Sequence, residues 1–176
     1  LDVLDYVKKI DGSESTKLDF FKNPSCYKST FLKFTEVADV FIAGHFYGKG
    51  SPYFFNRKEA KSPNFKIKVV ADISCDIDGP VACTIRPSTI ESPIYGYNPQ
   101  TESEVDFNSQ GSIAVMAVDN LPCELPRDAS DGFGEVFVNK IIPAFFDGDA
   151  DGILMRSKMT DNGKLTPNFS YLQKFV

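Results

Sequence analysis

Residues 69–79, with the sequence VVADISCDIDG, constrain the fold of this chain more than any other segment. Four mostly apolar residues lead directly into a polar and acidic series that begins at Asp72. An apolar run bounded by polar residues and glycine predicts a strand that is buried on both faces, as in a parallel sheet. Ligands of open α/β sheets bind beyond the carboxyl ends of such strands, so the acidic series is a candidate site.

Two further segments have the composition of short core strands. Residues 37–44 and 112–118 are apolar, and the connections between the three segments are long enough for crossovers. We therefore expect the three segments to be neighbouring parallel strands of one sheet. Asp76 and Asp119 follow two of these strands, which predicts one site built from two parts of the chain. An aspartate at a strand end also serves as a turn former or a helix N-cap, and that alternative stays open.

The remaining patterns complete an α/β order of elements. Residues 1–10 have a helical spacing, and the chain begins inside that pattern, as expected for a piece of a longer protein. The longest predicted helix covers residues 127–146, with Pro143 kinking or ending it. The other expected elements are a helix at 57–61, short strands near Thr84 and Ile94 within a long excursion at 75–110, a turn at Asn162-Gly163 and a helix at 168–175.

Composition narrows the classes of function. The chain has 176 residues and a formal net charge of −5, and an acidic chain without a basic stripe is a poor binder of nucleic acid or membrane surfaces. The four cysteines form no CxxC pair, so we expect reduced thiols and a cytoplasmic location.

Metal sites are not predicted. The single histidine, His45, excludes a histidine cluster. The calcium-like segment 147–152 has Lys158 where the metal would need a carboxylate, and an acidic turn is the better interpretation. His45 follows the strand predicted at 37–44, where it either lines a cleft or caps the strand.

Three stretches, in order, resemble a known family: ADISCDIDGPV (71–81), RPSTIESPIY (86–95) and VDNLPCELPRDAS (118–130). They are similar to the C-terminal half of the alanine dehydrogenase and proton-translocating transhydrogenase superfamily, above all to lysine-ketoglutarate reductase and the saccharopine dehydrogenases. The resemblance implies an α/β fold that is the second half of a Rossmann-type parallel sheet, with a C-terminal helical return to a substrate domain. Residues 1–126 would then be a partial dinucleotide-binding domain, and residues 127–176 the returning helical segment.

The resemblance also implies an activity. Such enzymes form saccharopine from lysine and 2-oxoglutarate with reduced NAD or NADP, so the partners would be amino-acid and oxo-acid substrates and, through the parent protein, further copies of the chain. The family's glycine-rich fingerprint and its acid/base Lys and His lie upstream of the part that aligns, so the chain alone is expected to be inactive. Another amino-acid dehydrogenase, such as alanine dehydrogenase, and a non-catalytic nucleotide-binding module are the alternatives.

The resemblance assigns roles to individual residues. Asp76 and Asp119 match acidic residues of the family's active site and are the catalytic candidates. The family usually has an apolar residue in place of His45, so the resemblance gives His45 no catalytic role. The predicted cofactor-binding residues lie in a loop that packs on the dinucleotide, near the nicotinamide ribose and beneath the ring: Gly44, His45, Phe46, Tyr47, Ile73, Val118, Asn120 and Leu121.

Overall fold

The computed structural model describes residues 1–175, which divide into two compact units. Unit 1 is Leu1–Leu121 and contains the sheet, and unit 2 begins at Pro122 and is mainly helical. Within the described residues no helix combines the length and the apolar character needed to cross a membrane.

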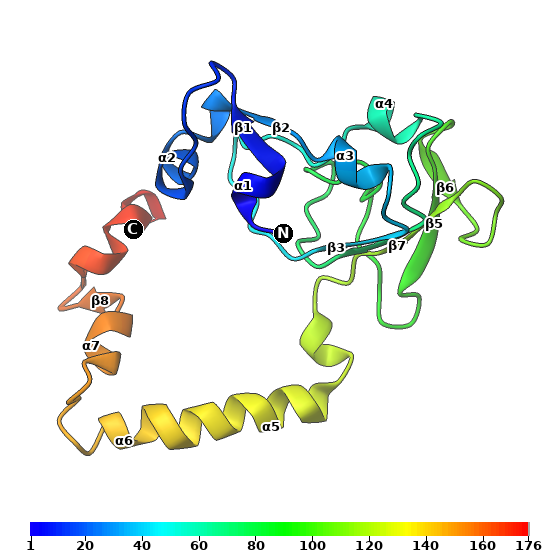
Figure 1. Ribbon diagram of the computed structural model, residues 1–176. Helices are drawn as coiled ribbons and strands as arrows, with labels where there is room; N and C mark the ends of the chain where they lie inside the picture. The colour runs from blue at the N-terminus through cyan, green and yellow to red at the C-terminus, as the bar shows by residue number, and fades with distance from the viewer. Residues whose placement is uncertain (176) are drawn as a thin grey trace. The chain divides into compact units, whose positions relative to one another are not determined.

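The three predicted core strands are confirmed as parallel neighbours. Strand β3 (Val40–Ala43) pairs with β4 (Val69–Asp72), and β4 pairs with β7 (Ile113–Met116) (Figure 1). Ala43 lies opposite Asp72 in this register. The carboxyl ends of the three strands therefore meet at one edge of the sheet, where the acidic loops begin.

The complete sheet is mixed. Strand β5 (Ile94–Asn98) pairs antiparallel with β7 and with β6 (Ser103–Val105), which gives the order β3-β4-β7-β5-β6. The α/β fold class and the strand near Ile94 are confirmed, but the expectation of a purely parallel sheet is wrong. The expected strand near Thr84 is also wrong, because this buried side chain lies in a loop and donates to the Asp72 carboxylate.

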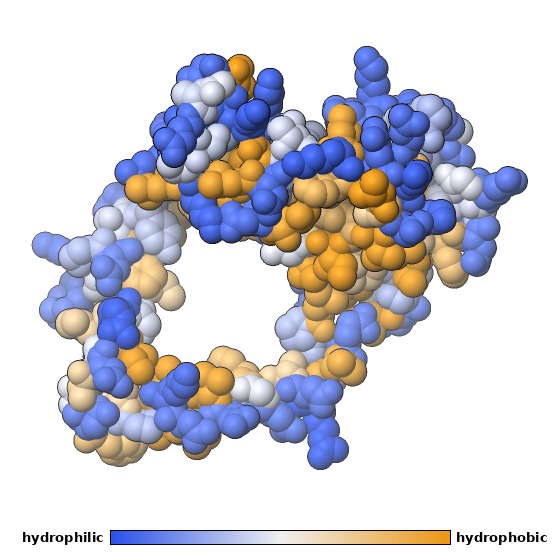
Figure 2. Space-filling view, in the orientation of Figure 1, coloured by the Kyte–Doolittle hydropathy of each residue, from blue (hydrophilic) through white to orange (hydrophobic). Residues whose placement is uncertain are grey.

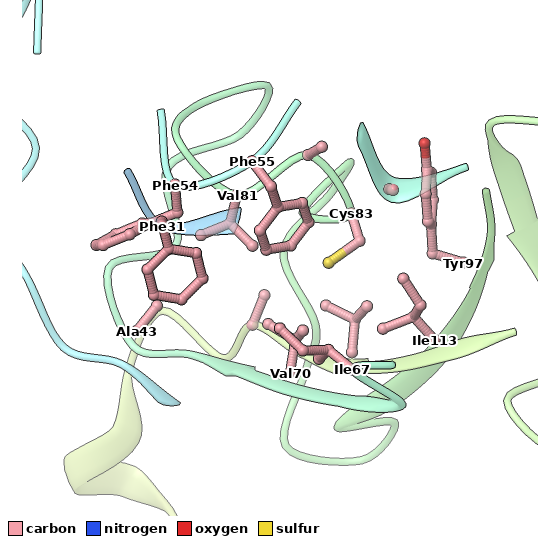
Figure 3. Packing of buried hydrophobic residues seen from close by; sticks show 14 of the residues in the cluster. Phe31, Ala43, Phe54, Phe55, Ile67, Val70, Val81, Cys83, Tyr97 and Ile113 are labelled. Carbon is pink, nitrogen blue, oxygen red and sulfur yellow. The ribbon is translucent and has the colours of Figure 1, made fainter. Parts of the chain in front are cut away.

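One face of the sheet carries the core. Val70 and Val115 are fully buried among side chains of the covering helices and loops, which Figure 3 shows converging on Phe55 and Val81. The other face is open in the described residues: Ile42, for example, is 64% exposed. Strand β4 therefore alternates between buried and exposed positions, and the prediction that it is buried on both faces is wrong for this chain.

The N-terminal segment differs from its helical pattern. Asp2 caps a short helix, α1 (Val3–Tyr6), through a capping box, and strand β1 (Val7–Lys9) follows. Burial of Val7 against Phe20 and pairing with a later strand outweigh the local helical spacing. The remaining elements of unit 1 are α2 (Lys17–Lys22), η1 (Pro24–Cys26), β2 (Tyr27–Ser29), α3 (Leu32–Thr35) and α4 (Arg57–Ala60), the last as predicted.

Unit 2 contains the predicted long helix. Helix α5 (Pro126–Val136) continues through a π-helical turn, η3 (Phe137–Ile141), into α6 (Ile142–Ala144), and the helix ends one residue after Pro143, as expected. The wide turn fits a proline that has no N–H and crowds the preceding turn. The other elements are η2 (Leu121–Cys123), which crosses the boundary between the units, α7 (Ile153–Ser157), β8 (Thr160–Asp161), β9 (Lys164–Leu165) and the 3-10 segment η4 (Pro167–Phe175).

Two local predictions in unit 2 are confirmed. Asn162 and Gly163 have positive φ and form the turn between β8 and β9. The calcium-like segment is a helix-capping turn in which the Asp149 carboxylate accepts from the backbone N–H groups of Leu154 and Met155, at 2.9 and 2.8 Å.

Candidate functional site

The candidate site lies at the carboxyl ends of β3, β4 and β7. The loop after β4 is tied to the end of β3, because the Ala43 carbonyl accepts from the N–H groups of Ile73 and Ser74 at 2.9 and 3.2 Å. The same loop is tied to the end of β7, because the Cys75 thiol donates to the Ala117 carbonyl at 3.1 Å. The ends of the three strands are thus joined through one loop.

Asp72 anchors this loop. It is fully buried, and its carboxylate accepts from the Ser74 N–H (3.1 Å), the Ser74 hydroxyl (2.5 Å), the Cys75 N–H (3.3 Å) and the Thr84 hydroxyl (2.6 Å). Burial of an ionised carboxylate is costly unless such donors surround it. Asp72 therefore holds the backbone that presents Cys75 and Asp76.

A tight turn follows Asp76. The N–H of Gly79 donates to the Asp76 carbonyl at 3.0 Å, and a Cβ on Gly79 would lie 2.7 Å from both the Asp76 carbonyl oxygen and its Cβ. Only glycine allows this close approach without a backbone shift. The Arg57 guanidinium forms an ion pair with Asp78, which fixes the outer side of the turn.

The two predicted catalytic carboxylates come together around Cys75. Burial raises the pKa of the Cys75 thiol, and the negative charges of Asp72, Asp119 and Asp76 raise it further. Since these charges come from the ends of β4 and β7, carboxylates of two chain segments share one neighbourhood. Asp119 does not cap the next long helix, because the N-cap position of α5 is Leu125.

His45 follows β3 on the same side of the sheet. Burial lowers the pKa of its imidazole, and the nearby charges of Asp72 and Asp76 oppose this shift without reversing it. The ring packs edge-to-face on Phe54, with the ring centroids 4.5 Å apart. Both ring nitrogens are buried and have no hydrogen-bond partner among the described residues.

A pocket of about 570 Å³ opens beside the end of β3. Its wall is mostly aromatic and includes Phe31, Phe41 and Phe54. Pockets of this kind, apolar with a few polar groups, are typical of sites for small molecules. Four of the predicted cofactor-binding residues line it: Gly44, His45, Phe46 and Tyr47.

The other predicted cofactor-binding residues lie outside the pocket wall. The Ile73 side chain is 46% exposed and Asn120 is exposed, while Leu121 is half-buried. Val118 is only 2% exposed, so only its backbone groups are free to contact a ligand.

Sequence reasoning missed the roles of Asp72, Cys75 and Thr84. An Asp followed two residues later by Ser is the signal of a local side-chain turn, and it marks Asp72 as a loop anchor. The contact with Thr84 bridges 12 positions of sequence and has no local signal. Within residues 1–175, no group of three or more His, Cys, Asp and Glu side chains is arranged to hold a metal ion.

The arrangement defines a class: an α/β protein whose candidate ligand site lies where parallel strands end. No family model matches the chain. The alpha-aminoadipic semialdehyde synthase of Arabidopsis thaliana is 28% identical over 97% of this chain, and the mitochondrial synthase of Mus musculus is 26% identical over 96%. A saccharopine dehydrogenase [NAD(+), L-lysine-forming] of Schizosaccharomyces pombe is 30% identical over 71% of the chain.

These relatives confirm the resemblance seen in the motifs. The chain is homologous to alpha-aminoadipic semialdehyde synthases and saccharopine dehydrogenases, at modest identity over most of its length. It spans 17% and 21% of the plant and mouse synthases and 33% of the yeast dehydrogenase.

Proposed function

We propose that this chain forms the nicotinamide side of the cofactor site in an enzyme that makes saccharopine from lysine and 2-oxoglutarate. The observation that carries the proposal is the meeting of Asp76 and Asp119, from two strand ends, at one edge of the sheet. The names of the relatives supply the reaction class. Residues 1–126 would be part of the dinucleotide-binding domain and residues 127–176 the helical return to the substrate domain.

The residues fit a nicotinamide group. The aromatic pocket wall accepts a flat ring, and the strand ends offer backbone groups to the ribose and carboxamide. When bound, the reduced cofactor supplies a hydride to the carbon that joins the lysine nitrogen to 2-oxoglutarate. Either NAD or NADP fits this part of the fold, and the yeast relative is named for NAD(+).

Asp119 and Asp76 act through charge. Condensation of the lysine amine with the oxo-acid carbonyl releases water and leaves a cationic iminium, which the hydride then reduces to a secondary amine. An exposed carboxylate at Asp119 orients the lysine ammonium and stabilises the iminium. Asp76, held by the Asp72 anchor, adds negative charge on the same edge.

The rival functions differ in what they require. An alanine dehydrogenase would use the same cofactor edge with ammonia instead of lysine as the nitrogen donor. A nucleotide-binding module would keep the pocket without turnover. The cytoplasmic location and the homo-oligomer remain predictions, and the mouse relative's name assigns that protein to mitochondria.

A chimera tests the proposal: this chain replaces the matching segment of the Arabidopsis synthase. We expect saccharopine formation from lysine and 2-oxoglutarate, and we expect Asp119→Asn to lower kcat by an amount equivalent to about 2–4 kcal/mol of barrier. The matched control is Asp39→Asn, a surface residue that pairs with Lys68 at the opposite end of the strands. Equal kcat for Asp119→Asn and the parent chimera, with both folded, would remove Asp119 from the catalytic set.

The isolated chain gives a second test. No glycine-rich turn of the dinucleotide type follows a strand in this sequence, so the pyrophosphate lacks its usual helix N-terminus. We expect no measurable oxidation of NADH or NADPH by the 176-residue chain with lysine and 2-oxoglutarate. Robust turnover would show that the catalytic groups lie within this chain and have been misassigned.

A further inference from the structure

The His45 imidazole is the least satisfied polar group of the candidate site. Both of its nitrogens are buried without a partner among the described residues, whereas the neighbouring Asp72 carboxylate accepts four hydrogen bonds. Buried polar groups in native proteins are almost always paired, and an unpaired one calls for a specific explanation. His45 lines the aromatic pocket, so a ligand in that pocket is the natural source of a partner.

The charge state of the ring limits what that partner is. Because burial lowers the pKa of His45, the imidazole is neutral near pH 7, with one N–H donor and one acceptor nitrogen. Asp72 and Asp76 are the charged groups that act on the ring, and both are negative. Their field favours the proton on the nitrogen nearer the carboxylates and leaves the other nitrogen as an acceptor.

An acceptor nitrogen selects a ligand that donates. The aromatic wall around it, with Phe41, Phe46 and Tyr47, favours a flat ring over a chain of hydroxyl groups. Side chains at binding sites commonly change rotamer on binding, so the present burial of the nitrogens does not bar contact with a ligand. A planar ring with a primary amide satisfies both requirements.

We propose that His45 is a specificity-determining residue whose unprotonated ring nitrogen accepts a hydrogen bond from the carboxamide NH₂ of the nicotinamide ring. This inference rests on the proposed cofactor site and deepens it. It gives His45 a binding role where the family resemblance implies an apolar residue and no catalytic role.

Binding to the complete 176-residue chain tests the inference with three probes. NADH carries the carboxamide, reduced 3-acetylpyridine adenine dinucleotide replaces its NH₂ with a methyl group, and ADP-ribose lacks the ring. We expect NADH to bind about three- to tenfold more tightly than the acetylpyridine analogue, the range of one uncharged hydrogen bond. His45→Leu should remove this discrimination by weakening NADH alone.

His45 is the only histidine, so its ring nitrogens are directly visible in spectra of ¹⁵N-histidine-labelled chain. NADH should shift the resonance of the acceptor nitrogen, and the acetylpyridine analogue and ADP-ribose should not. This readout needs no variant and is independent of whether His45→Leu folds.

The outcomes separate the two proposals. NADH binding with no discrimination and no shift of the histidine nitrogens would overturn the role of His45 and leave the cofactor site standing. A shift produced equally by ADP-ribose would also overturn it, because the ribose would then be the partner. Failure of every probe to bind would overturn the cofactor site, and the role of His45 with it.

Discussion

Unit 1 and unit 2 bury their apolar residues to very different extents. Unit 1 places a continuous cluster of fully buried residues, including Phe55, Val70 and Val115, beneath its helices and loops. In residues 122–175 the single buried residue is Ala144, and large apolar side chains such as Phe146, 85% exposed, face outward. Figure 2 shows this apolar surface in orange along α5. The difference teaches that unit 1 has a core of its own, whereas the helices of unit 2 require burial against something else.

The largest expected effect comes from removing a core ring. Phe55→Ala should lower the free energy of unfolding by about 3–5 kcal/mol, because the residue is 0% exposed and leaves a cavity. Phe146→Ala in unit 2 should change it by less than about 0.5 kcal/mol. Urea denaturation of both variants checks the pair, and equal losses would show that unit 2 has a core of comparable importance.

Two aspartates sharpen the same comparison. Asp72→Ala should cost about 2–3 kcal/mol, because buried donors such as the Thr84 hydroxyl lose their acceptor. Asp149→Ala, which removes an exposed cap of α7, should cost about 1 kcal/mol or less. Thermal melts rank the two, and the reverse order would refute Asp72 as the anchor of the site loop.

Glycine substitutions should have opposite signs in the two units. Gly79→Ala should destabilise by about 1–3 kcal/mol, because the new Cβ would lie 2.7 Å from Asp76 atoms. Gly132→Ala lies in α5 with open space around the new Cβ, and alanine in a helix interior should stabilise by about 0.5–1 kcal/mol. The helical content and midpoint of unfolding measure both changes, and a stabilising Gly79→Ala would contradict the tight turn.

The smallest expected effect is a pH dependence from His45. Its folded pKa lies below the usual value near 6.5, so the unfolded chain binds the proton more readily. Stability should therefore fall as pH drops through about 6.5 towards the lower folded pKa, and no such loss should occur above that range. Denaturation between about pH 7.5 and 5.5 should show a smaller pH slope for His45→Gln than for the parent chain. Parallel slopes would mean that burial does not perturb His45.

The sequence predicts the parallel part of this fold well and the long-range part poorly. Strands β3, β4 and β7 follow from local apolar runs, and the helix ending near Pro143 follows from local chemistry. Strand β1 was missed because its pairing with β2 outweighs a helical spacing. The antiparallel β5–β6 hairpin makes the sheet mixed, which no single local pattern predicts.

The candidate site shows the same division. The gathering of Asp76 and Asp119 follows from their places after neighbouring strands, because parallel strands end at one edge. The anchor Asp72 depends on Thr84, and the pocket depends on aromatic residues from distant segments such as Phe20 and Phe31. Spacing along the chain carries no information about such contacts.

The central claim is that the ends of β3, β4 and β7 form one nicotinamide site. Backbone amide spectra of the ¹⁵N-labelled 176-residue chain, recorded as NADH is added, test it most directly. The account predicts saturable shifts concentrated at residues 44–47, 73–76 and 118–121. Unchanged amides in all three segments at saturating NADH, or shifts confined to unit 2, would contradict it.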